Sequence, residues 1–138
     1  MGAVEWIMLV VLAAFAAYDI KTKTIPVAAV TIAATGILMY RFCIGTAIAE
    51  LVIGLVPGVL VLVIAFATKE SIGGGDGLVL CMLGLLLGWR QCVAVFGMAL
   101  VLSAVLAMIL LVCRKAGRKT ELPFLPCLFG GYLLFYLW

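Results

Sequence analysis

The sequence predicts an all-α polytopic integral membrane protein with about six transmembrane helices. Two observations predict this fold class: 68% of the 138 residues are hydrophobic and only 11% are charged. A soluble domain of this length would be roughly half apolar and about a quarter charged. Because a water-soluble core cannot absorb this excess, we expect a single domain, residues 1–138, surrounded by the lipid bilayer.

Charged residues and helix breakers divide the chain into six apolar segments, each a candidate for a spanning helix of about 20 residues. In chain order these segments are about Ala3–Tyr18, Ile25–Tyr40, Thr46–Thr68, Gly77–Trp89, Cys92–Cys113 and Leu122–Trp138. The third contains Pro57 and is expected to kink there, because proline removes a backbone donor and clashes with the preceding turn. The fourth is short for a full span unless it extends into the glycines before it.

The basic residues of the loops predict the orientation of the helices. Seven of the nine Lys and Arg residues follow the first, third and fifth segments, whereas only Arg41 and Arg90 follow the second and fourth. Cytoplasmic loops are enriched in Lys and Arg. We therefore expect these three loops in the cytoplasm and both termini outside. The basic residues do not gather with aromatic ones, so no nucleic-acid surface is expected.

Small residues inside the apolar segments indicate packing rather than chemistry. The chain has five cysteines, no CxxC pair and no histidine, so we expect no metal site and no cofactor. The cysteines lie in or at the ends of apolar segments and are expected to be small buried hydrophobic residues. The pairs Gly54/Gly58 and Gly84/Gly88 have the spacing that favours close packing of membrane helices.

The chain has two aspartates, Asp19 at the end of the first segment and Asp76 at the start of the fourth. Each has a simple structural explanation: Asp76 as a helix cap, and Asp19 as a solvated helix end. Ionisable groups close to hydrocarbon are costly and often mark function. If the two converge, they share a proton. The ionised carboxylate then activates water, and the protonated one donates to an amide carbonyl oxygen.

Asp76 follows three glycines, Gly73, Gly74 and Gly75, in the stretch GGGDG. We expect this stretch to permit positive φ and to let a substrate backbone approach the carboxylate closely. A phosphate-binding loop is disfavoured, because no Lys-Ser/Thr follows the glycines and a carboxylate repels phosphate.

These residues resemble the type IV prepilin peptidase family, which are GxGD membrane aspartyl proteases. Gly73, Gly75 and Asp76 occupy the fixed positions of GxGD, within the longer pattern E-x-x-G-x-G-D. Further features of the family also occur, namely an aspartate ending the first helix, an Ile-Pro pair after it and a Pro-Phe-x-Pro start of the last helix: Asp19, Ile25, Pro26, Pro123, Phe124 and Pro126.

The resemblance implies an aspartyl endopeptidase that removes the short leader of prepilin-like or pseudopilin-like proteins at the cytoplasmic face of the cell's inner membrane. It implies Asp19 and Asp76 as the catalytic pair, no cofactor, and the substrate and the lipid bilayer as partners. A homo-oligomer is left open. The sequence departs from the family at Val27, where Asn is usual, and at Leu78-Val79, where many members have Lys-Leu. Substrate positioning is therefore expected to differ.

Longer members of the family carry a tetracysteine domain and also N-methylate the new pilin terminus. Without CxxC pairs, this chain is expected to be a short, peptidase-only form.

Other functions stay open. A small ion- or proton-coupled transporter or channel would use Asp19 and Asp76 as binding groups, but transport pathways usually have polar residues along their depth. Here nearly all charges lie at helix ends. A catalytically inactive assembly factor with the same fold would not need both aspartates. A presenilin-like protease shares Tyr18-Asp19 and GxGD, but normally has more helices.

Overall fold

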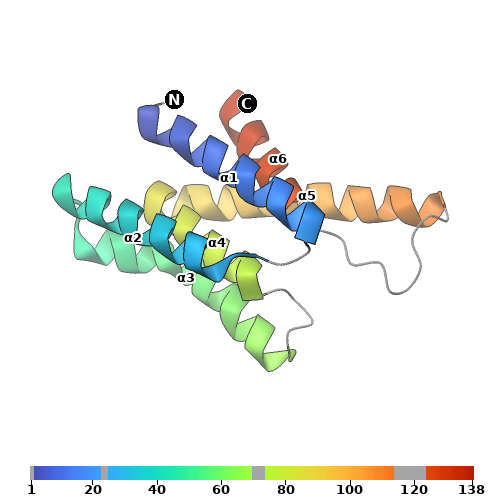
Figure 1. The fold of residues 1–138 in the computed structure, drawn as a ribbon, viewed down its shortest axis with the longest axis horizontal. Helices are drawn as coiled ribbons and strands as arrows, with labels where there is room; N and C mark the ends of the chain where they lie inside the picture. The colour runs from blue at the N-terminus through green and yellow to red at the C-terminus, as the bar shows by residue number, and fades with distance from the viewer. Residues whose placement is uncertain (1, 23–24, 70–73, 114–123) are drawn as a thin grey trace. The chain divides into compact units, whose positions relative to one another are not determined.

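The computed structural model describes residues 2–22, 25–69, 74–113 and 124–138. These residues form six α-helices, coloured from blue to red along the chain in Figure 1. Their bounds are α1 Ala3–Thr22, α2 Val27–Cys43, α3 Ile48–Ala67, α4 Gly74–Leu87, α5 Trp89–Val112 and α6 Phe124–Leu137. The predicted all-helical fold class is confirmed.

Two helix ends near the aspartates differ from the sequence prediction. α1 continues past Tyr18 to Thr22, so Asp19 lies inside its last turn rather than at its end. α4 begins at Gly74, three residues before the predicted start at Gly77, and therefore includes Gly74, Gly75 and Asp76 of the GGGDG stretch as well as Gly77. Polar residues at a membrane boundary do not stop a helix, because its backbone hydrogen bonds continue without any apolar side chain.

The helices differ in how far they can reach across a bilayer. Three are long and apolar enough to span it, namely α1, α3 and α5. The others are shorter apolar helices, and the 14 residues of α4 and of α6 correspond to about 21 Å at about 1.5 Å per residue. That length is less than the hydrocarbon core of about 30 Å. The protein is a multi-pass membrane protein.

One compact unit, residues 24–94, contains α2, α3 and α4, with α4 packed against both other helices. Gly54 of α3 faces Gly84 of α4 so closely that a Cβ on either would meet the other's backbone oxygen. A Cβ on Gly58 would likewise overlap the Sγ, the backbone nitrogen and the Cα of Cys81 in α4. The predicted role of these glycines in close packing is confirmed. Gly88 has another role: its φ of 81° makes the turn between α4 and α5.

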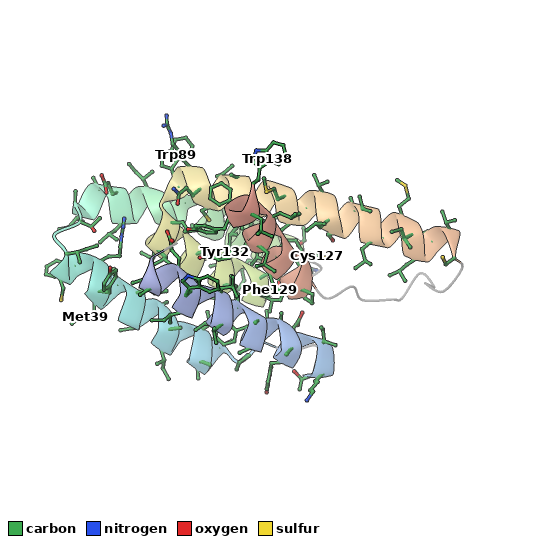
Figure 2. The ribbon with its side chains drawn as sticks, turned by 90° about the horizontal axis from the view of Figure 1, so that it is seen from above. Met39, Trp89, Cys127, Phe129, Tyr132 and Trp138 are labelled. Atoms are coloured by element: carbon green, nitrogen blue, oxygen red, sulfur yellow. The ribbon has the colours of Figure 1, made fainter. Side chains whose placement is uncertain are left out.

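The second compact unit comprises residues 1–23 and 95–138, and in it α1 packs against α6. The two helices run antiparallel, and both chain termini lie at the same end of the pair (Figure 1). Figure 2 shows Cys127, Phe129 and Tyr132 along α6, with Trp138 just beyond its end. Tyr132 is fully buried, and its hydroxyl donates to the backbone oxygen of Glu5 over 3.2 Å.

The cysteines follow the prediction of burial only in part. Cys92 and Cys127 are buried, but Cys43 and Cys113 are exposed at helix ends. The prediction is wrong for the exposed pair because lipid is as apolar as a protein interior, so an apolar context does not imply an interior position. α3 continues through Pro57, and the kink expected there stays a prediction.

Candidate active site

Asp19 is the buried charged residue of the described chain, with 7% of its surface exposed. Its carboxylate is hydrogen-bonded by the backbone N–H of Leu125, in the first turn of α6. The first N–H groups of a helix have no partner within the helix, and they form the positive end of the helix dipole. Asp19 is therefore held at the end of α6 that best accommodates a carboxylate.

The last three residues of the Pro-Phe-x-Pro motif, Phe124 to Pro126, form the start of α6. The helix begins at Phe124, and Pro126 lies in its first turn, where the missing N–H of proline costs no helical hydrogen bond. The Phe124 ring packs edge-on against Phe96 of α5, with ring centroids 6.0 Å apart. Pro123 lies outside the described residues. Phe124 and Pro126 thus set the start of the helix whose amide meets Asp19.

Asp76 lies in the first turn of α4 and is partly exposed. The simple structural explanation required Asp76 to be the N-cap residue of this helix. Because α4 begins at Gly74, Asp76 does not occupy the N-cap position. An acidic side chain in a first turn is favoured by the positive end of the helix dipole. The structure therefore places Asp76 on a helix rather than in a loop.

The glycines beside Asp76 are used for packing. A Cβ on Gly75 would lie 2.5 Å from Cδ1 and 2.8 Å from Cβ of Ile25. A Cβ on Gly77 would lie 2.8 Å from Cγ of Leu62 in α3. Among the residues described, the glycines with positive φ are Gly45 and Gly88. Gly75 therefore does not use the positive φ that the stretch was expected to permit, and Gly73 lies outside the described residues.

Ile25 and Pro26, predicted as supporting residues, lead into α2. The Pro26 carbonyl accepts the N–H of Val30 over 3.1 Å and so starts the helix. Ile25, just before it, contacts Gly75. The structure thus brings the Ile-Pro pair to the glycine segment. Neither the contact between Leu62 and Gly77 nor the role of the Leu125 amide was predicted from the sequence, although a glycine directly after Asp76 is a signal for close packing.

The two aspartates belong to different compact units, Asp19 to the unit of α1 and α6, and Asp76 to the unit of α2, α3 and α4. Each has its own surroundings, and the convergence of the two carboxylates stays a prediction. Within residues 2–22, 25–69, 74–113 and 124–138, no three His, Cys, Asp or Glu side chains are grouped as metal ligands would be.

Comparison with known proteins identifies the relatives of this chain. Residues 6–113 match the type IV leader peptidase family. The chain is 30% identical over 87 residues to a prepilin leader peptidase/N-methyltransferase of Bacillus subtilis, covering 62% of this chain and 35% of that protein. The match thus spans about a third of the relative's length. No solved structure matches. Since the family match covers most of the sequence and includes both aspartates, the chain belongs to the type IV leader peptidase family.

Proposed function

We propose that the protein is an aspartyl endopeptidase that removes the leader peptide of prepilin-like or pseudopilin-like membrane proteins, with residues 1–138 acting as one catalytic domain. The observation that carries this proposal is that both of its aspartates, Asp19 and Asp76, fall within the residues that match the leader peptidase family. The burial of Asp19 and the placement of Asp76 on a first helical turn support it. Both are features of preorganised groups rather than of solvated helix ends.

In the proposed reaction, Asp19 and Asp76 converge on the scissile amide and share one proton. The ionised carboxylate takes a proton from water as the water oxygen attacks the amide carbon. The protonated carboxylate donates its proton to the carbonyl oxygen. When the tetrahedral intermediate collapses, the C–N bond breaks and the amine leaves with a proton returned from the pair. The two carboxylates titrate as one unit.

We propose that this reaction takes place at the cytoplasmic face, with both termini on the opposite side. The distribution of Lys and Arg among the loops supports this orientation. The antiparallel pair of α1 and α6 is consistent with it, because its two chain termini lie at one end while Asp19 and Leu125 lie at the other.

The experiment that tests the function is a cleavage assay in cells that also produce a prepilin-like substrate. Wild type, Asp19→Asn and Asp76→Asn are compared at equal levels in the membrane. We expect wild type to shorten the substrate and both variants to leave it intact, since asparagine is isosteric but cannot transfer the proton. Processing by both variants would rule out the aspartyl protease mechanism. We also expect no methylation of the new N-terminus, checked by the mass of the cleaved substrate.

A further inference from the structure

We infer that Ile25 and Leu62 are positioning residues that fix the direction of the Asp76 carboxylate, an inference that rests on the proposed function. Their side chains occupy the space that a side chain at position 75 or 77 would need. The glycines on both sides of Asp76 are thus required by the protein's own packing rather than by an approaching substrate backbone.

The two contacts fall on nearly opposite faces of α4. Successive residues of an α-helix are turned by about 100°, so positions 75 and 77 lie about 200° apart around the axis. Gly75 meets Ile25 at the start of α2, and Gly77 meets Leu62 of α3. α4 also packs against both α2 and α3. The first turn of α4 is therefore held on two sides, by Ile25 and by Leu62, and Asp76 lies between the two contacts. We call these two contacts the clamp.

The contact at Gly75 is rigid because it involves the Cβ of Ile25 as well as the flexible end of its side chain. A Cβ on Gly75 would lie 2.8 Å from Cβ of Ile25, as well as 2.5 Å from Cδ1. Rotation about χ1 moves Cδ1 but leaves Cβ in place, so no rotamer of Ile25 relieves the overlap. Pro26 restricts the Ile25 backbone in addition. Any side chain at position 75 must therefore displace the turn that carries Asp76.

The clamp at Gly77 has a different origin. A Cβ there would lie 2.8 Å from Cγ and 2.9 Å from Cδ2 of Leu62, but 3.2 Å from its backbone nitrogen. Shortening Leu62 to alanine removes both close side-chain atoms. Alanine in place of Leu62 therefore relieves the overlap at position 77, whereas alanine in place of Ile25 leaves part of the overlap at position 75. A general loss of stability would not produce this difference.

The experiment measures leader cleavage by the full chain with the same prepilin-like substrate. We expect Gly75→Ala and Gly77→Ala to lower kcat by about 10- to 100-fold with little change in KM, since a 1 Å misplacement can cost this much. Adding Leu62→Ala should recover part of the activity of Gly77→Ala, because the overlap is relieved while the Leu62 contact is lost. Adding Ile25→Gly should recover more of the activity of Gly75→Ala than adding Ile25→Ala does, because alanine keeps the overlapping Cβ. Gly36→Ala in α2, where a Cβ meets nothing within 4 Å, is the matched control.

A second readout does not depend on catalysis. In a full-length variant with its five cysteines replaced, Asp76→Cys is introduced and its rate of reaction with a small maleimide is measured. Gly75→Ala should change this rate, and adding Ile25→Gly should return it only part of the way, because the overlap is relieved but the Ile25 contact is lost as well. Ile25→Ala alone, which keeps both glycines, should also change it. If wild type does not cleave the substrate, the proposed function fails while this labelling still tests the clamp. Unchanged labelling, or no rescue in well-accumulated variants, would overturn the inference.

Discussion

The backbone N–H of Leu125 hydrogen-bonds the carboxylate of Asp19 and so joins the first turn of α6 to the last turn of α1. At the other end of the same helix pair, the Tyr136 hydroxyl donates to Oε1 of Glu5 over 3.0 Å. Two antiparallel apolar helices are thus held at both ends by polar contacts, which fixes their register better than apolar packing alone, since apolar contacts are not directional.

Removal of the Leu125 amide should impair catalysis beyond the loss of its side chain. Leu125→Pro removes the N–H at a first-turn position where proline is tolerated, and Leu125→Ala keeps the N–H while removing the same buried side chain. A hydrogen bond to a charged group contributes about 1.5–3 kcal/mol, so we expect cleavage by the proline variant to be roughly 10- to 100-fold slower than by the alanine variant. Equal rates at equal membrane levels would mean that this amide does not support Asp19.

Loss of the Tyr136 hydroxyl should destabilise the pair of α1 and α6 without affecting the Asp19 end directly. Tyr136→Phe removes the donor to Glu5 and should lower the free energy of unfolding by about 1 kcal/mol. Thermal unfolding of the detergent-solubilised protein measures this change. Tyr18→Phe, which alters an exposed tyrosine of α1, is the control and should leave the midpoint unchanged. A similar shift in both variants would contradict a specific role for the Tyr136 hydroxyl.

The contact between Gly54 and Gly84 should not tolerate a methyl group. A Cβ on either glycine would overlap the other's backbone oxygen, which no side-chain rotation relieves. We expect Gly84→Ala to destabilise the protein by about 1–3 kcal/mol through overpacking. Gly36→Ala, in an open part of α2, should instead be neutral or stabilising by up to about 1 kcal/mol. Thermal unfolding compares the two, and equal stability would show that α3 and α4 can separate freely.

The predicted orientation can be measured with two native cysteines. Cys43 and Cys113 are both exposed, Cys43 at the end of α2 and Cys113 just after α5. The distribution of basic residues places Cys43 outside and Cys113 in the cytoplasm. In single-cysteine variants in intact cells, a membrane-impermeant maleimide should therefore label Cys43 and leave Cys113 unlabelled until the membrane is opened. The reverse pattern would mean the opposite orientation.

Much of the fold could be predicted from the sequence because its signals are local. Apolar runs of helical length, separated by charges and glycines, predict six helices whatever their packing. Helix ends were less accurate, since Asp19 and Gly74 lie inside helices that the pattern ended at Tyr18 and began at Gly77. A polar side chain at a membrane boundary marks a change of solvent, whereas the helix ends only where its backbone hydrogen bonds do.

The sequence by itself determined the membrane environment, the two aspartates and the family, because composition and short motifs carry this information without any long-range contact. Only the tertiary structure decided the partners of those residues: the Leu125 amide at Asp19, and Ile25 and Leu62 against the glycines beside Asp76. Apolar side chains in lipid are compatible with either a lipid-facing or a buried position. Helix packing brings distant residues within a few ångström of one another. It therefore decides which glycine cannot be replaced by a residue with a side chain, and which backbone amide hydrogen-bonds a carboxylate.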